Sequence, residues 1–186
     1  MSNPRDVAVI VGSLRKESFS RKTARALSAL APPTLTLEIV EIGALPMYNQ
    51  DDEANAPAPW LAFRTRLRRA DAVLFVTPEY NRSVPGCMKN AIDVGSRPYG
   101  QSSWNAKPGG VVSVSPGAQG AFGANQHLRQ SLVFLNIPVL QQPEAYVGNA
   151  AKLFDEGGAL IDDAGRDFLK KFIEAYAQWV ERILMH

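Results

Sequence analysis

Apolar segments of strand length alternate with helical segments along this chain, and the alternation predicts a three-layer α/β sandwich around a five-stranded parallel sheet. Segments 7–12, 72–76 and 111–115 are mainly apolar, which is typical of strands buried on both faces. Segment 35–42 alternates apolar and polar residues, which indicates a strand nearer an edge of the sheet. Segment 138–140 is short but apolar enough to supply the last strand.

Helical spacing of apolar residues predicts four helices between or beside these strands, over 21–30, 60–69, 86–94 and 124–135. A last helix carries a stripe of large apolar side chains on one face, namely Phe168, Leu169, Phe172, Ile173, Tyr176, Trp179, Val180 and Ile183. We interpret this stripe as packing against the sheet rather than as a cofactor contact.

Helices on both faces of a parallel sheet require right-handed crossovers, and five strands then suit the order 2-1-3-4-5. In that order a ligand crevice forms at the carboxyl ends of strands 1 and 3. The loops after Gly12, Val76 and Ser115 should therefore carry the site. The chain shows no internal repeat, so we expect one domain over residues 1–186.

The composition excludes several classes of protein. No stretch approaches the roughly 20 apolar residues of a membrane span, and the N-terminus lacks the apolar core of a secretory signal, so we expect a cytoplasmic protein without a membrane partner. The net charge of +2 comes from interspersed charges, which argues against a nucleic-acid partner. Cys87 is the only cysteine and His127 and His186 are the only histidines, so no metal site is expected.

The loop between the first strand and the first helix is rich in hydroxyl groups. Ser13, Ser18 and Ser20 can donate to phosphate at a helix N-terminus, and Arg15 can pair with phosphate oxygens. The alternative is that these serines only cap the helix. Because Gly12 stands alone, neither the Gly-x-Gly-x-x-Gly fingerprint nor the nucleotide P-loop is present. The loop therefore suits a phosphate monoester such as that of FMN better than the pyrophosphate of a dinucleotide.

A series of short motifs then follows in order along nearly the whole chain: Gly12-Ser13-Leu14-Arg15, Pro78-Glu79-Tyr80-Asn81, Pro85-Gly86, Lys89-Asn90-Ala91-Ile92-Asp93, Arg97-Pro98-Tyr99-Gly100, Ser115-Pro116-Gly117 and Leu128-Arg129-Gln130-Ser131-Leu132. Together they resemble the NADPH-dependent FMN reductase family. The resemblance implies a flavodoxin-like fold, bound FMN and a homodimer or homotetramer. It also implies reduction of quinones, azo dyes, chromate, ferric chelates or free flavin. Ser20 departs from the asparagine of many members, which predicts weaker FMN binding.

The second loop has chemistry that suits a flavin ring. Tyr80 offers a flat surface, Pro78 sets the direction of the chain after the strand, and backbone amides near Glu79, Tyr80 and Asn81 can reach the ring edge. The alternative for Glu79 is a charge at a loop or helix entry. In the third loop, glycines allow backbone N–H groups to approach a ligand, and the resemblance places this loop at the pyrimidine end of the flavin.

Other candidates are more ambiguous. Arg97 either reaches a flavin edge or a nicotinamide phosphate, also across a subunit interface, or makes only a surface contact. Cys87 is interpreted as a packing residue, and His127 as an interface or surface residue. Lys89 and Asp93 are spaced for a surface ion pair. In the basic helix 60–69, Arg64, Arg66, Arg68 and Arg69 are interpreted as a solvated face, with attraction of an anionic substrate as the alternative.

We therefore predict a flavoenzyme in which NADPH or NADH reduces FMN and a small-molecule acceptor reoxidises it in a ping-pong cycle, with no essential catalytic side chain. Arg97 and Asn81 are predicted to contact the substrate. The predicted cofactor-binding residues are Ser13, Arg15, Ser18, Phe19, Ser20, Pro78, Glu79, Tyr80, Asn81, Ser115, Pro116, Gly117 and Gly120. The alternatives are a flavodoxin-type electron carrier, a nicotinamide dehydrogenase without flavin, and a regulatory protein that only retains the fold.

Overall fold

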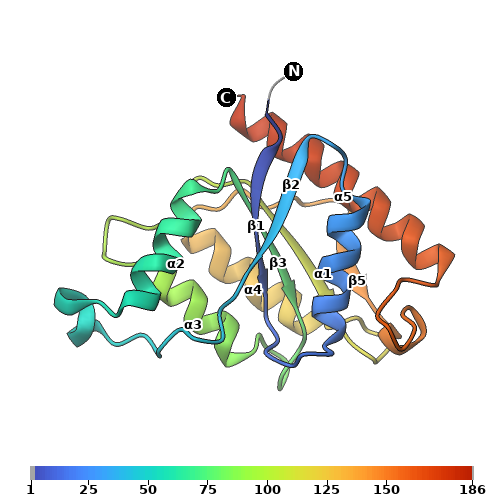
Figure 1. Ribbon diagram of the computed structural model, residues 1–186, viewed down its shortest axis with the longest axis horizontal. Coiled ribbons are helices and arrows are strands. Elements are labelled where there is room, and N and C mark those ends of the chain that lie inside the picture. Colours follow the sequence, from blue (N-terminus) through green and yellow to red (C-terminus); the bar gives the residue numbers. More distant parts are fainter. Residues whose placement is uncertain (1–2, 186) are drawn as a thin grey trace.

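A parallel sheet of five strands forms the middle layer of the computed structural model, which describes residues 3–185 (Figure 1). The strand order is β2-β1-β3-β4-β5, and every neighbouring pair is parallel, as the alternation of segments predicted. His186 and the first two residues of the predicted 1–186 domain lie outside the described residues. The strands are β1 (Arg5–Val11), β2 (Leu35–Val40), β3 (Ala72–Thr77), β4 (Gly109–Val114) and β5 (Ala145–Val147).

Helices cover both faces of the sheet and create two separate cores. One core lies between the sheet and the pair α1 and α5, and the other lies between the sheet and α2, α3 and α4. No helix within residues 3–185 is long and apolar enough to cross a membrane. The helices are α1 (Phe19–Leu30), α2 (Ala58–Arg69), α3 (Gly86–Gly95), α4 (Phe122–Phe134) and α5 (Asp163–Leu184), with short 3-10 helices η1 (Gln50–Asn55) and η2 (Ala150–Lys152).

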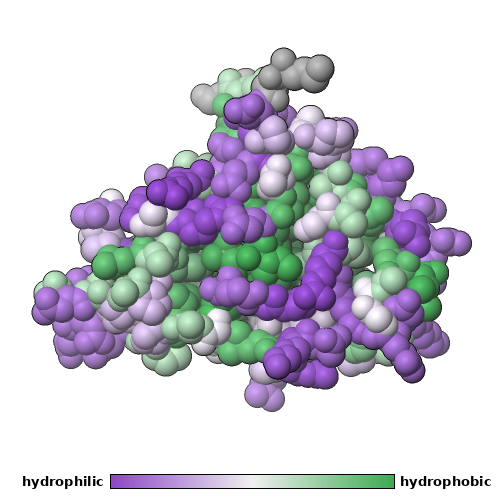
Figure 2. Space-filling view, in the orientation of Figure 1, coloured by the Kyte–Doolittle hydropathy of each residue, from purple (hydrophilic) through white to green (hydrophobic). Residues whose placement is uncertain are grey.

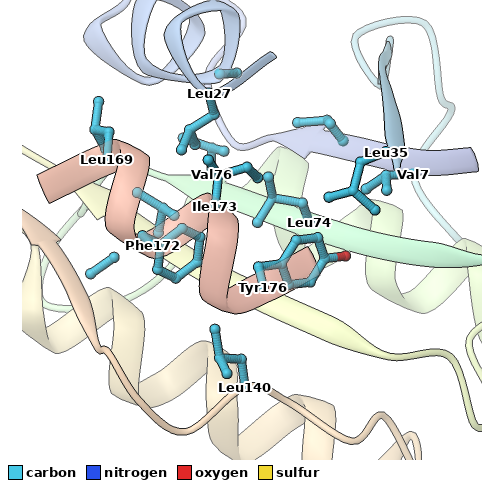
Figure 3. Close-up of a cluster of buried hydrophobic side chains, with 14 of the residues drawn as sticks. Val7, Leu27, Leu35, Leu74, Val76, Leu140, Leu169, Phe172, Ile173 and Tyr176 are labelled. Carbon is cyan, nitrogen blue, oxygen red and sulfur yellow. The ribbon is translucent and has the colours of Figure 1, made fainter. Parts of the chain in front are cut away.

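The stripe on α5 packs on the sheet, as predicted. Leu169, Phe172, Ile173 and Tyr176 are fully buried in the first core (Figure 3). Each such side chain stabilises the fold by roughly 1.5–3 kcal/mol through removal of its apolar surface from water. The phenol of Tyr176 also donates a hydrogen bond to the carbonyl oxygen of Val73 at 2.8 Å, so α5 is joined to β3 by a polar contact inside this core.

Strand β2 lies at the edge of the sheet, which its alternating sequence indicated. Its residues Leu37 and Ile39 are only partly buried. Figure 2 shows mostly hydrophilic side chains over this face of the molecule, with a hydrophobic area near the centre, where β2 crosses β1 in this view. Strand β2 is thus only partly buried, whereas β3 and β4 are buried along their whole length.

The prediction of the last strand was wrong. Val139 forms only an isolated bridge with Gly109, and the strand itself is formed by Ala145–Val147, which pairs with the carboxyl half of β4. After Leu140 the polar segment 141–144 leaves the sheet. Segment 138–140 instead lies beside the start of β4, where the backbone N–H of Gly109 donates to the Pro138 carbonyl at 3.0 Å and that of Leu140 donates to the Gly109 carbonyl at 2.8 Å. Ala145 and Val147 are buried where their segment pairs with the later residues of β4. The strand order is unchanged.

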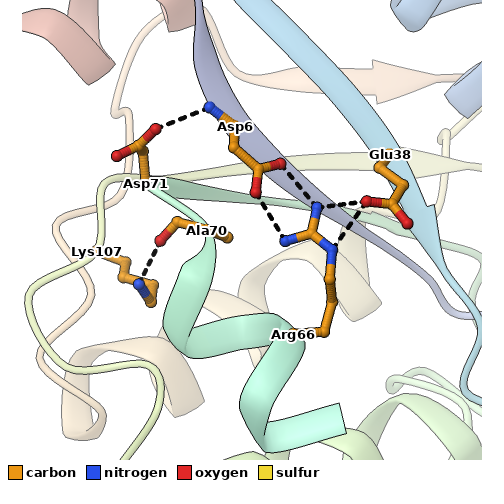
Figure 4. Close-up of polar contacts among 6 residues, drawn as sticks. All are labelled: Asp6, Glu38, Arg66, Ala70, Asp71 and Lys107. Carbon is orange, nitrogen blue, oxygen red and sulfur yellow. Dashed lines mark hydrogen bonds and ion pairs between the residues drawn. The ribbon is translucent and has the colours of Figure 1, made fainter. Parts of the chain in front are cut away.

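The interpretation of the α2 arginines as a solvated face was also wrong for two of them. Arg64 is only 2% exposed, lies over the Trp60 ring at 5.4 Å and donates from Nε to the Val94 carbonyl at 2.8 Å, and burial lowers its pKa. Arg66 bridges Asp6 and Glu38 at the amino edge of the sheet (Figure 4). Both guanidinium groups make these contacts because α2 packs against α3 and against β1.

Candidate functional site

Three loops at the carboxyl edge of the sheet surround a small cleft. They follow β1, β3 and β4, the places that the strand order predicted, and lie at the lower edge of the molecule in Figure 1. The cleft has a volume of about 140 Å³ and receives residues from all three loops: Ser13, Arg15, Ser18, Phe19, Ser20, Pro78, Glu79, Tyr80, Val114, Ser115 and Pro116.

A second cavity adjoins this cleft and shares Ser13, Arg15 and Tyr80 with it. Its volume is about 410 Å³, and it extends toward the N-terminus of α3, with walls formed by Gly12, Ser13, Leu14, Arg15, Tyr80, Pro85, Gly86 and Cys87. The two spaces together make a site with a hydroxyl-rich part at the start of α1 and a more apolar part at the start of α3.

The first loop presents unused hydrogen-bond donors. Ser13 and Ser20 are 4% and 2% exposed, yet neither hydroxyl has a hydrogen-bond partner within residues 3–185. Ser18 is different, because its Oγ accepts from the backbone N–H of Arg21 at 3.1 Å and so caps α1. Arg15 is exposed at the rim. The first turn of α1 contains no acidic residue, so its positive end is available to an anion.

The second loop contains a tight two-residue turn. The backbone N–H of Tyr80 donates to the Ser83 carbonyl at 2.9 Å, and that of Ser83 donates to the Tyr80 carbonyl at 3.0 Å. Asn81 and Arg82 between them both adopt left-handed conformations, with φ of 51° and 64°, which is the geometry of a type I′ turn. This turn leaves the Tyr80 side chain 53% exposed beside the cleft, while Asn81 does not line it.

Gly12 permits the close approach of the first two loops. A Cβ atom at this position would lie 3.1 Å from both Met88 Cε and Thr77 Oγ1, and 3.2 Å from Pro78 Cδ. The backbone N–H of Gly12 also donates to the Val76 carbonyl at 2.8 Å. A side chain here would therefore push the hydroxyl-rich loop away from the second loop.

The third loop places only part of its predicted residues in the cleft. Ser115 and Pro116 line it, whereas Gly117 and Gly120 are not among its lining residues. Gly120 has φ of 59°, and a Cβ there would be 2.6 Å from the Tyr146 carbonyl carbon. The glycine is thus required for packing against β5, and its carbonyl accepts from Ser113 Oγ at 2.7 Å.

The carboxylate of Glu79 binds the start of α4, although the residue also lies at the cleft. Its Oε2 accepts from the backbone N–H of Ala124 at 3.1 Å, at the start of α4, and its side chain is 17% exposed. The interpretation as a helix-entry charge therefore describes its protein contact, although the residue also lines the cleft.

Arg97 lies apart from the three loops within this chain. Its guanidinium is 5.6 Å from the centre of the Tyr48 ring. It lines a third cavity of about 520 Å³ formed by residues after α3 and at the end of α4, among them Tyr99 and Phe134. Those two aromatic side chains are 87% and 88% exposed. One chain alone does not bring Arg97 to the predicted flavin site.

Several other side chains have clear places in the structure. Lys89 and Asp93 form the expected ion pair at 2.7 Å. Cys87 is half-buried with Sγ 3.5 Å from the Gly12 carbonyl oxygen, and burial raises the pKa of its thiol. His127 is exposed, with Nδ1 3.0 Å from Ser83 Oγ.

Sequence reasoning missed some residues of the site. Val114 lines the cleft, and Leu14, Pro85 and Gly86 line the adjoining cavity, although none was predicted to bind a ligand. Outside the cleft, the buried Asn90 has a structural role that the sequence did not indicate: its Nδ2 donates to the Leu45 and Pro46 carbonyls. Leu14, Pro85 and Gly86 lie within the predicted loops and Val114 directly precedes one, which was the available signal. Nothing near Asn90 in the sequence indicates its distant partners.

The fold and the cleft together define a flavodoxin-like α/β protein with a phosphate-compatible pocket at the carboxyl edge of the sheet. The profile of the family described as NADPH-dependent FMN reductase matches residues 5–152. The chain belongs to this family, and is therefore an FMN-dependent oxidoreductase that uses NAD(P)H.

The similar proteins agree with one another. The chain is 65% identical over 182 residues to a quinone reductase of Pseudomonas putida, covering 97% of each chain. It is 44% identical over 174 residues to a 2-hydroxy-1,4-benzoquinone reductase of Burkholderia sp, covering 94% of this chain and 95% of that one. The solved structure of FerB, a flavoenzyme NAD(P)H:(acceptor) oxidoreductase from Paracoccus denitrificans, superposes with a TM-score of 0.90 at 43% identity, covering 96% and 98% of the two chains.

Proposed function

We propose that this chain is an NAD(P)H:quinone oxidoreductase that retains FMN at the three-loop site. The observation that carries the proposal is the pair of Ser13 and Ser20 hydroxyls, which make no hydrogen bond within residues 3–185 and line the cleft beside a more apolar cavity, in a chain 65% identical to a quinone reductase. Hydroxyls that line a cleft and have no protein partner can donate to a ligand bound there.

The first loop is proposed to hold the FMN phosphate. Ser13 and Ser20 would donate hydroxyl hydrogens, the backbone N–H groups at the start of α1 would donate along the helix axis, and Arg15 would pair with the phosphate from the rim. Ser18 caps α1 and contributes by fixing the orientation of those N–H groups. Phe19, in the first turn of α1, lines the same cleft.

The second and third loops are proposed to hold the flavin ring. Pro78 and Tyr80 provide surface for the ring, with the backbone of Glu79 and Asn81 toward its edge. Ser115 and Pro116 would contribute a further part of the lining, and Gly117 and Gly120 would shape the turn that follows them. When bound there, FMN supplies hydride acceptance from NAD(P)H and electron delivery to the acceptor. The protein orients both substrates, and no side chain is assigned an essential acid or base role.

Arg97 is proposed to act in an assembly of chains. Within one chain it stands away from the cleft, next to the exposed rings of Tyr99 and Phe134. Large exposed apolar side chains of this kind are typical of subunit contacts. We propose a homodimer or homotetramer in which Arg97 approaches the substrate of a neighbouring site, and an acceptor among the quinones, with azo dyes, chromate, ferric chelates and free flavin as further candidates.

Anaerobic reduction of the purified holoprotein tests the proposal. Stoichiometric NADPH or NADH should bleach the flavin absorbance, and subsequent benzoquinone should restore it within the same active site. Release of reduced FMN through a filtration membrane would favour free flavin as the product. Slow bleaching by both nucleotides, together with a stable one-electron form during photoreduction, would instead support a flavodoxin-type carrier and refute the oxidoreductase assignment.

A further inference from the structure

The N-terminus of α4 has no capping group of its own. Its N-cap residue, Ala121, is in the left-handed region with φ of 60° and has no side-chain oxygen. The first turn of α4 contains no acidic residue. Helix starts leave unpaired N–H groups and a partial positive charge, so this end requires an acceptor from elsewhere in the molecule.

Glu79 supplies that acceptor from the second loop, 45 residues earlier in the chain. Its Oε2 accepts the Ala124 N–H at 3.1 Å, and its side chain is only 17% exposed. A Cβ on Gly123 would stand 3.0 Å from this oxygen, so the glycine leaves room for the carboxylate. The contact therefore depends on residues of both elements.

A second contact joins the same loops. Arg82 Nη1 lies 3.6 Å from Glu79 Oε1 and 3.3 Å from Gln119 Oε1 of the third loop. The tight turn at Tyr80–Ser83 is thus held to the start of α4 through Glu79 and to the third loop through Arg82. Both loops line the cleft in which the flavin is proposed to bind.

We propose that Glu79 is a positioning residue that joins the second and third loops and, through its charge, lowers the midpoint potential of the bound flavin. This inference rests on the proposed function, because it requires FMN in the three-loop cleft. A flavin gains negative charge on reduction, and the positive end of α4, which directly follows the third loop, would without Glu79 favour the reduced form. The Glu79 carboxylate offsets that positive end and adds a negative charge to the wall of the cleft.

Two substitutions separate the effect of the hydrogen bond between Glu79 and Ala124 from the effect of the Glu79 charge. Glu79→Gln keeps the shape and an oxygen that can accept from Ala124, but it removes the charge. Glu79→Ala removes both the acceptor and the charge. Glu174→Gln is the matched control, because Glu174 is an exposed residue of α5 that lines only a surface cavity near Pro32 and Thr34.

The readouts are the dissociation constant of oxidised FMN, measured by quenching of flavin fluorescence, and the midpoint potential of the holoprotein, measured anaerobically against a reference dye. In Glu79→Gln we expect oxidised FMN to bind within about threefold of wild type. Its affinity for reduced FMN relative to oxidised FMN should rise about tenfold, which is about 30 mV upward for a two-electron couple. Glu79→Ala should also weaken binding of oxidised FMN by about tenfold, because the Ala124 N–H loses its acceptor and the Tyr80–Ser83 turn is no longer held to α4.

A midpoint potential in Glu79→Gln that equals the wild-type value, or lies below it, would overturn the proposed role of Glu79. The same shift in Glu174→Gln would overturn it as well, because a general loss of negative charge would then explain the change. Wild-type protein that binds no FMN, or that NAD(P)H does not reduce, would refute the proposed function itself, so the two failures are distinguishable.

Discussion

Removal of the two unpartnered serine hydroxyls should weaken FMN binding selectively through the phosphate. Ser13 and Ser20 are almost completely buried and have no hydrogen-bond partner within residues 3–185, so Ser→Ala at either position breaks no bond of the free protein. A hydrogen bond to a charged group contributes about 1.5–3 kcal/mol. Each substitution should therefore raise the dissociation constant of FMN by roughly 10- to 100-fold, since about 1.4 kcal/mol corresponds to a factor of ten.

Riboflavin provides the discriminating measurement, because it carries the same ring without the phosphate. Titration of apoprotein by fluorescence quenching should show unchanged riboflavin affinity in Ser13→Ala and Ser20→Ala. The urea midpoint of the apoprotein should also be unchanged, because no native contact is lost. Ser28→Ala is a control on α1, the helix that also carries Ser20. The Ser28 hydroxyl donates to the Ala24 carbonyl and does not face the cleft.

An equal loss of affinity for FMN and riboflavin would refute the reasoning, because the serines would then act on the ring or on the loop conformation. Unchanged FMN affinity in both variants would refute it more directly. The phosphate would in that case lie elsewhere, and the two unpartnered hydroxyls would line the cleft without contributing to FMN binding.

Three further substitutions or treatments test other parts of the structure. Arg15→Ala should weaken FMN binding by several-fold, with a smaller effect at high salt, and equal binding at all salt concentrations would contradict a phosphate contact from the exposed rim. Tyr176→Phe should lower the free energy of unfolding by about 1 kcal/mol with an unchanged urea m-value, through loss of the bond to Val73, and activity per folded molecule should not change. The thiol of Cys87 should react with iodoacetamide more slowly than a free cysteine at pH 8, because burial raises its pKa and leaves less thiolate at that pH. Its rate should increase at higher pH, and a rate equal to that of free cysteine would show the thiol to be open to solvent.

Most of the fold could be predicted from local patterns. The apolar runs that became β1, β3 and β4 are buried on both faces in any parallel sheet, so their composition alone predicts their position in the middle of the sheet. The last strand was mispredicted because 138–140 and 145–147 are both short and apolar. Both lie beside β4, 138–140 at Gly109 and 145–147 at Val112–Val114, and neither segment alone shows which of them forms the longer pairing.

The candidate site was predictable to the level of loops. Strand order placed the three loops together, and the hydroxyls of Ser13 and Ser20 are where the sequence suggested. The sequence left open which of the three serines caps the helix, and it did not show that Gly120 is required by Tyr146 rather than by a ligand. The roles of Ser18 and Gly120 both depend on which atoms of the folded chain lie next to them.

The amino-acid sequence by itself determined the order of strands and helices, the hydroxyl-rich loop at the start of α1 and the membership of a flavin-dependent family. These features depend on periodicity, on turn residues and on short motifs, all of which act over a few neighbouring residues. Tertiary structure decided the partner of Glu79, the burial of Arg64 and the distance of Arg97 from the cleft. The residue type fixes the charge and the length of a side chain, but its partner depends on which distant helix packs beside it.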